Sequence, residues 1–467
     1  MPPTFVIPKE ITDILPWMRK TRAWLVGGSV RDYFLQRPTH DFDLVVERDA
    51  IEIGRKLANA QGGDFYILDA DRKICRVLLA RPDHTVTFDL AALQEPEIEA
   101  DLRQRDFTIN ALAVDLANGI LLDPTGGLQD LHDHRLNPCA SDSIQRDPIR
   151  ILRAVRFAVE LNLRWTEAGI KQIRAGRDYL GEISPERIRD EFFCILNLNR
   201  VETALRLMEH EDLIDRLLPD ISPPGSAFSW GGLETLEWTS RLCGWLEPAR
   251  QAHAASLMEA EVFTQLGPWR RSISSQLLQV NASGRNRRQR LFLAAYAAGS
   301  REEDPASAQQ TDVVAERLRL SNVERDSLAR MVSLQTPIER IHAEGELLTR
   351  QGYRFFQAAG DVGCEGILLF LARGFSRLGP AANPELWQPR LTTAAFLLEA
   401  VIGKREIFGA QPLLDGIEIQ RLLDLEPGPQ VGLLIKRLQE AQALGEVNTR
   451  SDAEQFVSAI QGTAQDR

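Results

Sequence analysis

Two aspartates separated by a single residue, Asp41 and Asp43, are the residues in this sequence best suited to hold a metal ion. They open a run of alternating polar and apolar residues, and the period of two in a strand places both carboxylates on one face. Neighbouring carboxylates repel one another unless a cation neutralises them. Mg²⁺ prefers oxygen ligands and commonly bridges carboxylates and phosphates. The pair therefore predicts a catalytic Mg²⁺ site; the alternative is a solvated acidic pair at the start of a strand.

A third carboxylate would complete a two-metal site, in which ions about 3.5–4 Å apart activate the attacking and leaving oxygens of a phosphoryl reaction. Asp89 is the best candidate, because it ends a second strand-like run, Thr85–Asp89. We expect Asp89 to join Asp41 and Asp43 as a catalytic residue. The alternative is an ordinary surface position.

A glycine turn precedes the aspartate pair. The segment Leu25-Val-Gly-Gly-Ser-Val-Arg-Asp32 predicts a strand that runs into two glycines and then a helix. Glycines let the backbone approach a phosphate closely, and a helix start offers free N–H groups. An arginine in that helix can hold a phosphate with two hydrogen bonds. The segment predicts nucleotide binding by Gly27, Gly28, Ser29 and Arg31; a plain strand–turn–helix connection is the alternative.

Two later segments carry further polar residues at helical spacing. The first, residues 101–110, offers an aspartate that can accept from ribose hydroxyls and an arginine that can hold phosphate. The second, residues 147–156, repeats charged residues every three positions, so that neighbours touch on a helix and present both donors and acceptors to the edge of a base. In each segment a helix cap is the alternative role for the aspartate. The candidate nucleotide-binding residues are Arg105, Asp106, Asn110, Asp147, Arg150, Arg153 and Arg156.

Taken in order, five segments resemble the motifs of one known family. They are Gly-Gly-Ser-Val-Arg-Asp, Asp-Phe-Asp, Arg-Asp-Phe-Thr-Ile-Asn-Ala, Asp-Pro-Thr-Gly-Gly-Leu-Gln-Asp-Leu and Asp-Pro-Ile-Arg-Ile-Leu-Arg-Ala-Val-Arg-Phe-Ala. Over residues 22–200 the sequence resembles the class II tRNA nucleotidyltransferases. These are the bacterial-type CCA-adding enzymes and their poly(A) polymerase relatives, within the DNA polymerase beta superfamily.

The resemblance implies Mg²⁺-dependent addition of nucleotides to the 3′ end of tRNA, from CTP with or without ATP. It implies that Asp41 and Asp43 hold the metal, that Asp106 meets the ribose, and that Asp147 and Arg150 pair with the incoming base. It also implies that Glu186 and Arg187 brace the neck. The residues implied to contact the triphosphate are Gly28, Arg31, Arg105, Arg153 and Arg156.

The sequence departs from the family's pattern in one informative place. Only Leu90–Ala100, eleven residues, separates the Asp89 strand from Asp101. Enzymes that add the whole CCA carry a longer flexible loop there, whereas members with a short loop stop after CC. The resemblance therefore favours CC addition over CCA addition.

The elements that must position these residues fall into two kinds. Up to about residue 137, strand-like runs alternate with helices. The predicted strands are Ala23–Val26, Phe42–Val46, Phe65–Leu68, Ile74–Leu79, Thr85–Leu90 and Ile120–Asp123, and the predicted helices include Val30–Gln36, Ala50–Gln61, Asp106–Val114 and Asp147–Leu161. Beyond residue 138 the pattern is helical. We expect an α+β fold with a mixed-sheet head at 1–137, a neck at 138–200, a helical body at 201–330 and a helical tail at 331–467.

The composition suits a cytoplasmic protein. The net charge is −11, so RNA must bind at a local basic patch. The five scattered cysteines form no CxxC pair, which disfavours a zinc site and a disulfide framework. We see no run of about 18 uncharged apolar residues and expect no membrane span. The sequence indicates no oligomeric state.

One basic stretch is a candidate RNA contact. Residues 262–301 contain seven arginines and no acidic residue. We expect the body and tail to bind tRNA, with RNA contacts at Arg285, Arg287, Arg288 and Arg290. A solvated basic face is the alternative.

Other functions compete with this one. A poly(A) polymerase would share the head motifs, but the chain ends in acidic and neutral residues rather than a basic tail. An A-adding tRNA nucleotidyltransferase is disfavoured by the short loop. A non-catalytic RNA-binding protein is disfavoured by the presence of Asp41, Asp43, Arg105 and Asp147.

Overall fold

The computed structural model describes residues 5–218, 228–250, 256–298, 306–379 and 382–465. The chain forms two compact units. The first comprises Met1–Asn199 with His210–Leu217, and so joins the expected head and neck. The second comprises Arg200–Glu209 with Leu218–Arg467.

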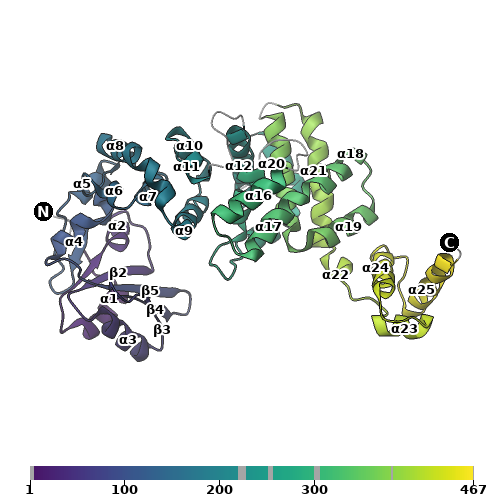
Figure 1. Ribbon diagram of the computed structural model, residues 1–467, viewed down its shortest axis with the longest axis horizontal. Helices are drawn as coiled ribbons and strands as arrows, with labels where there is room; N and C mark the ends of the chain where they lie inside the picture. The colour runs from purple at the N-terminus through teal and green to yellow at the C-terminus, as the bar shows by residue number, and fades with distance from the viewer. Residues whose placement is uncertain (1–4, 219–227, 251–255, 299–305, 380–381, 466–467) are drawn as a thin grey trace. The chain divides into compact units, whose positions relative to one another are not determined.

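A seven-stranded mixed sheet forms the centre of the first unit (Figure 1). Its strands stand in the order β3-β4-β5-β2-β1-β6-β7. Neighbours are antiparallel except β2 and β5, which run parallel. The strands are β1 Ala23–Val26, β2 Asp41–Val46, β3 Asp64–Asp69, β4 Ile74–Ala80, β5 Thr85–Ala92, β6 Ala113–Asp115 and β7 Leu121–Leu122.

Alternation decides which face of the sheet is buried. In β2 the side chains of Phe42, Leu44 and Val46 are buried, whereas Asp41 and Asp43 are exposed on the other face, as the sequence predicted. Phe42 stacks on Phe88 of β5, with ring centroids 5.6 Å apart. The alternation therefore anchors β2 to its neighbour and leaves both carboxylates free of the core.

Helices complete the first unit. The helix α3 packs against β4 and β5, α2 packs against β1 and β2, and α7 packs against α9. A two-stranded sheet joins β8 Arg135–Leu136 to β9 Arg164–Trp165. The helices are α1 Lys9–Met18, α2 Gly28–Phe34, α3 Ala50–Gln61, α4 Ile98–Gln104, α5 Gly127–His132, α6 Ser143–Arg146, α7 Arg150–Glu160, α8 Glu167–Gly176, α9 Pro185–Leu196 and α11 Ile214–Leu217.

The predicted helix at Asp106–Val114 is wrong. This segment is a short 3-10 turn, Thr108–Asn110, followed by strand β6 beside β1. Every residue from Asp106 to Leu116 is buried. The segment therefore lacks the exposed side of an amphipathic helix, and Ala113–Asp115 join the sheet instead.

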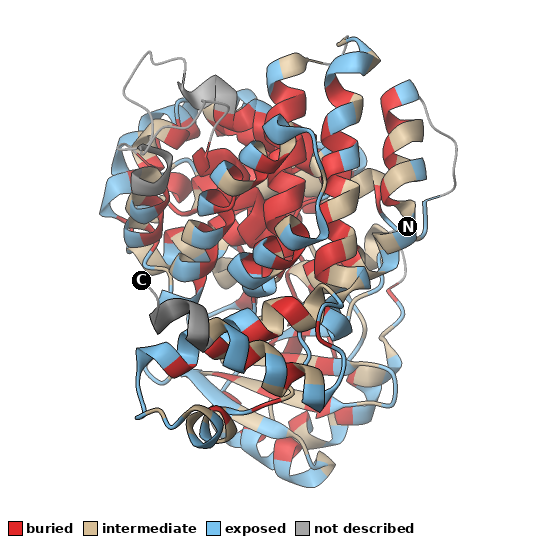
Figure 2. Cartoon of the chain, turned by 90° about the vertical axis from the view of Figure 1, so that its right-hand side faces the viewer, coloured by how far each residue is buried: buried red, intermediate tan, exposed pale blue. Residues whose placement is uncertain are grey.

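The second unit is helical. Its buried residues fill the interior of the helical layers, and its exposed residues lie outside (Figure 2). The helix α20 packs against α12, α15, α17, α18 and α21. The main helices are α10 Val201–His210, α12 Phe228–Trp245, α13 Leu257–Leu266, α14 Arg270–Leu277, α15 Arg287–Ala298, α16 Ala306–Arg317, α17 Asn322–Ser333, α18 Gln335–Glu344, α19 Thr349–Ala359, α20 Gly363–Leu378, α21 Pro384–Leu398, α22 Arg405–Phe408, α23 Gly416–Leu423, α24 Pro429–Ala443 and α25 Arg450–Gln465.

The second unit contains a separate small core at its C-terminal end. Leu414, Ile419, Leu434, Leu438 and Val457 bring α23, α24 and α25 together. The expected boundary between body and tail at residue 330 falls inside α17, whose residues pack with α15, α16 and α20.

One apolar helical stretch in the described residues, Thr349–Leu378, is long enough to cross a membrane by length and composition. Of its most apolar window, 72% is buried inside the protein. From Gly363 to Ser376, every residue of α20 is buried among the neighbouring helices. The stretch is therefore the core of the helical unit.

The arginines predicted to contact RNA lie inside the second unit. Arg285 pairs with Glu324 at 2.9 Å, and Arg287 donates to both oxygens of Glu365, the Nη2–Oε2 distance being 2.8 Å. Arg290 is buried and its Nη1 donates to Ser327 Oγ at 3.2 Å. Burial of these three residues contradicts both the predicted RNA contact and its alternative, a solvated basic face. Their partners lie on α17 and α20, inside the helical unit.

Arg288, the fourth arginine of this group, is less deeply buried than the other three. Arg288 is half-buried, with its guanidinium 5.7 Å from the centre of the Phe292 ring.

Burial raises the pKa of Glu324, but hydrogen bonds from Asn281, Arg285 and Ser321 outweigh it and lower that pKa to about 2. The ion pair of Arg285 and Glu324 is thus charged at every physiological pH.

We predict that Arg287→Met destabilises the protein by about 3–5 kcal/mol, because it leaves the fully buried Glu365 carboxylate without its cation. The free energy of unfolding is measured in urea. Arg271→Met removes an exposed arginine from the same basic stretch and should change stability by less than about 0.5 kcal/mol. Wild-type stability of Arg287→Met, combined with weaker tRNA binding, would restore the RNA-contact interpretation.

Candidate active site

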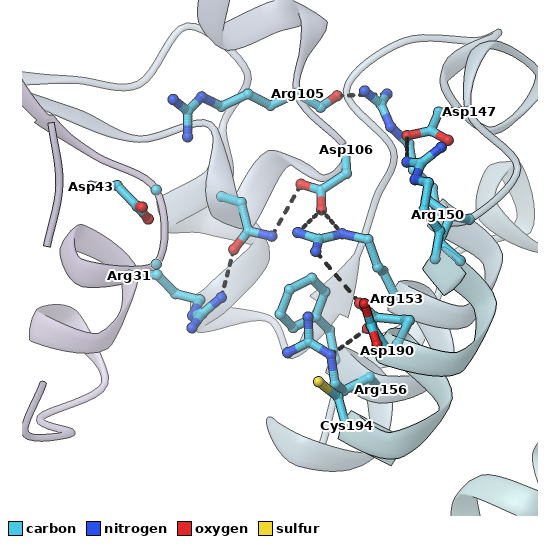
Figure 3. Close-up of a pocket in the computed structure, with 17 residues that line it drawn as sticks. Arg31, Asp43, Arg105, Asp106, Asp147, Arg150, Arg153, Arg156, Asp190 and Cys194 are labelled. Carbon is cyan, nitrogen blue, oxygen red and sulfur yellow. Dashed lines mark hydrogen bonds and ion pairs between the residues drawn. The ribbon is translucent and has the colours of Figure 1, made fainter. Parts of the chain in front are cut away.

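A cavity of about 670 Å³ opens beside β2 in the first unit. Its walls come from the turn between β1 and α2, the segment around Asp106, and the helices α7 and α9 (Figure 3). Of the candidate nucleotide-binding residues, the lining includes Gly27, Gly28, Arg31, Arg105, Asp106, Asn110, Asp147, Arg150, Arg153 and Arg156. Asp43 also lines it. The structure thus gathers ten of the eleven residues predicted to bind nucleotide.

Strand register brings the three candidate catalytic carboxylates together. Asp43 of β2 stands directly opposite Asp89 of the parallel strand β5, and Asp41 lies two residues away on the same face. Asp43 keeps access to solvent at the cavity, yet the surrounding protein raises the pKa of its carboxyl. Arg105 opposes that rise, whereas the charges of Asp89 and Asp41 add to it. Burial is the main cause of the raised pKa, and the two neighbouring carboxylates are a smaller one.

Asp89 differs from its prediction in two ways. It lies within β5, which continues to Ala92, rather than at the end of a strand. Both of its carboxylate oxygens accept hydrogen bonds from Arg76 of β4, Nε at 2.8 Å and Nη2 at 2.7 Å. The sequence analysis did not identify Arg76. The only signal for it was a polar position in the alternating run of β4.

Gly27 is a position that only glycine fills without strain. Its φ is 73° and its ψ is −134°, in a region that L side chains rarely adopt. A Cβ there would lie 2.9 Å from Arg105 Nη1 and 3.2 Å from Asp43 Oδ2. The glycine therefore lets the side chains of Arg105 and Asp43 approach the same turn.

Ser29 does not line the cavity. It is buried, and its hydroxyl donates to the carbonyl of Val26 at 3.1 Å. Its predicted contact with nucleotide is wrong, because the hydroxyl instead secures the turn at the end of β1.

A chain of hydrogen bonds crosses the floor of the cavity. Arg31 donates to Asn110 at 2.6 Å, and Asn110 donates to Asp106 at 3.1 Å. Asp106 then accepts from Arg153 at 2.8 Å (Figure 3). Burial raises the pKa of Asp106, but Arg153 and Asn110 outweigh it and hold that pKa below its usual value. Asp106 is therefore a buried, ionised carboxylate.

The same chain continues along α7 and α9. Arg153 lies 3.7 Å from Glu191, and Arg156 donates to Glu191 at 2.5 Å. The guanidinium groups of Arg31, Arg153 and Arg156 all lie over the ring of Phe157, at 5.3, 5.3 and 4.3 Å from its centre. Phe157 was not predicted as a site residue, and here it is the apolar platform that holds three cations in one wall.

Asp147 does not cap α7, which begins at Arg150. It has an extended backbone, and its carboxylate accepts from Arg187 of α9 at 2.8 Å. Arg150 donates to the backbone carbonyls of Gln104 and Arg105 at 2.9 and 3.1 Å, and to Ser143 Oγ at 2.6 Å. Asp147 and Arg150 thus lie in one cavity wall, each with a protein partner.

Comparisons with known proteins agree with this geometry. The Poly A polymerase head domain family matches residues 23–137, and the family described as "Probable RNA and SrmB- binding site of polymerase A" matches residues 166–223. Among solved structures, a CCA-adding enzyme with ATP is similar at a TM-score of 0.66 and 20% identity, covering 98% of this chain and 96% of that one. The Thermotoga maritima CCA-adding enzyme complexed with tRNA is similar at a TM-score of 0.62 and 21% identity, covering 98% and 96%. These likenesses establish the fold.

Curated relatives match along the whole chain. The CC-adding tRNA nucleotidyltransferase of Geobacter sulfurreducens is 33% identical, over 94% of this chain and 92% of its own length. The A-adding tRNA nucleotidyltransferase of Deinococcus radiodurans is 30% identical, over 93% and 94%. A match of this length and identity, on a chain that assembles the aspartates and arginines described above, makes this protein a nucleotidyltransferase of the tRNA nucleotidyltransferase family.

Proposed function

We propose that this enzyme adds two cytidylates to the 3′ end of tRNA, from CTP and with Mg²⁺, and that it releases pyrophosphate. The observation that carries the transferase part is the pair Asp41 and Asp43 on one face of β2, of which Asp43 lines an arginine-rich cavity. The observation that carries the CC part is the connection between β5 and α4, which is only the five residues Leu93–Glu97. Full-length CCA addition is associated with a longer loop at this place.

The residues present fit a Mg²⁺ ion. Asp41 and Asp43 offer oxygen donors from one strand face. Burial raises the pKa of Asp43, and the charges of Asp89 and Asp41 add to that rise, which a bound cation would oppose. Within the described residues no group of three or more His, Cys, Asp or Glu side chains is arranged to hold a metal. Two carboxylates suffice for Mg²⁺, which usually takes its other ligands from substrate phosphates and water. The bound ion would lower the pKa of the attacking hydroxyl and stabilise charge on the reacting phosphate.

The arginines would position the triphosphate. Arg31 and Arg105 face the glycine turn, and Arg153 and Arg156 face the same cavity from α7. The tRNA 3′-hydroxyl would attack the α-phosphate in line, forming the new O–P bond as the bond to the β-phosphate breaks and pyrophosphate leaves. Fixed guanidinium groups around the phosphates favour this geometry and the charge that develops in it.

Asp147 is the residue we propose to read the base. One of its oxygens accepts from Arg187, which leaves the other to accept from the exocyclic amino group of cytosine. Arg150 would donate to the base once it gives up one of its hydrogen bonds to a backbone carbonyl. We propose that Asp106 meets the ribose. A site built from such donors and acceptors disfavours a base that leaves them unpaired.

The relatives leave a second candidate. The full-length A-adding relative makes addition of a terminal adenylate to tRNA the alternative activity. We favour CC addition because of the short β5–α4 connection.

We also propose that exposed surfaces of the second unit bind the tRNA, since the arginines around α15 are internal. We further propose that the enzyme works in the bacterial cytoplasm.

The first test uses a tRNA transcript without its CCA end, Mg²⁺, and CTP alone, ATP alone or both. We expect two nucleotides to be added with CTP and no third when ATP is also present, as read on a sequencing gel. The variant Asp41→Ala, Asp43→Ala should add none. A third nucleotide with both substrates would establish CCA addition, and a single adenylate on a transcript that ends in CC would establish A addition.

A second test addresses base reading. We predict that Asp147→Ala lowers the preference for CTP over UTP by about tenfold or more, because the amino group of cytosine loses its acceptor. The measurement is kcat/KM for each nucleotide. Asp142→Ala removes a nearby carboxylate that pairs with Arg146 outside the cavity, and it should leave the preference unchanged. An unaltered ratio in Asp147→Ala would remove this residue from base recognition.

A further inference from the structure

Arg76, Asp89 and Asp43 form a row across three adjacent strands. Arg76 of β4 is the register partner of Asp89 of β5, and Asp89 is the register partner of Asp43 of β2. Directly paired residues in a sheet project from the same face. Arg76 therefore lies on the catalytic face of the sheet, one strand beyond the third carboxylate.

The contact between Arg76 and Asp89 uses the whole carboxylate. Nε donates to one oxygen at 2.8 Å and Nη2 donates to the other at 2.7 Å. This is the parallel two-bond geometry in which an arginine binds a carboxylate most strongly. The side chains are 42% and 26% exposed, so neither is locked in the core and both can exchange partners.

The surroundings of this pair distinguish it from an ordinary surface ion pair. An exposed pair contributes little to stability. Here the pKa of Arg76 is raised, first by its hydrogen bond with Asp89 and then by the charges of Asp89, Asp41 and Asp43. The guanidinium is thus the cation that pairs with Asp89 at the edge of the row of carboxylates.

We propose that Arg76 withholds Asp89 from the metal site, so that the resting enzyme offers a metal ion only Asp41 and Asp43. This inference rests on the metal-dependent function proposed above. With two carboxylates, an ion has too few protein ligands to bind tightly by itself and depends on phosphate oxygens for the rest. Arg76 is in this sense a positioning residue that couples metal binding to arrival of the nucleoside triphosphate.

The test measures binding of Mn²⁺ alone, without nucleotide or tRNA, by counting free Mn²⁺ in an electron paramagnetic resonance titration. Mn²⁺ is used because it shares the oxygen-ligand preference of Mg²⁺. We expect Arg76→Met to bind Mn²⁺ about tenfold more tightly than wild type, the order of effect seen when partners of metal ligands are changed. The double variant Arg76→Met, Asp89→Asn should return to within about twofold of wild type.

Two controls fix the interpretation. Arg72→Met removes an exposed arginine near the turn between β3 and β4 and should bind Mn²⁺ as wild type does. Far-ultraviolet circular dichroism and the urea midpoint confirm that each variant is folded. Asp41→Asn, Asp43→Asn should bind Mn²⁺ much more weakly than wild type.

The outcomes separate this inference from the proposed function. If Arg76→Met binds Mn²⁺ no more tightly than wild type while the Asp41→Asn, Asp43→Asn variant loses binding, the withholding role is overturned and the metal site stands. If the double variant binds as tightly as Arg76→Met, Asp89 takes no part in the tighter binding, and the role is again overturned. Unchanged binding in Asp41→Asn, Asp43→Asn would overturn both.

Discussion

A shift of β2 by a single residue would turn Asp41 and Asp43 into the core and push Phe42 and Leu44 into solvent. The hydrogen-bonded register of β2 between β1 and β5 prevents that shift, and the stacking of Phe42 on Phe88 reinforces it. The same register sets Asp89 beside Asp43. Every later feature of the site depends on this alignment, because the cavity, its arginines and the glycine turn are useful only where the carboxylates emerge.

The charged groups that line the cavity are already paired with one another. Asp106 is ionised although buried, since Arg153 and Asn110 hold it. Arg156 meets Glu191, and Asp147 meets Arg187. Under the proposed function, an incoming nucleotide would exchange partners with groups that are already oriented, instead of ordering free side chains. Such exchange reduces the reorganisation needed at the moment of reaction.

The sequence supported much of this site because its signals are local. The alternation in β2, the glycine turn and the spacing of the arginines on α7 each depend on neighbours in the chain. They indicated Gly27, Asp43 and Arg153, which line one cavity in the structure. What failed depended on tertiary structure. Arg287 looked exposed because its carboxylate, Glu365, is far away in sequence. Arg76 was missed for the same reason, since only strand pairing brings it to Asp89.

The hydrogen-bonded chain from Arg31 through Asn110, Asp106 and Arg153 to the vicinity of Glu191 has an energetic consequence. Its members share partners, so removal of one leaves the next with an unpaired polar group in a poorly solvated place. The free-energy effects of substitutions along it will not add, even for residues on different elements. The two walls of the cavity therefore behave as one cooperative unit, and a change at Arg31 is felt at α9.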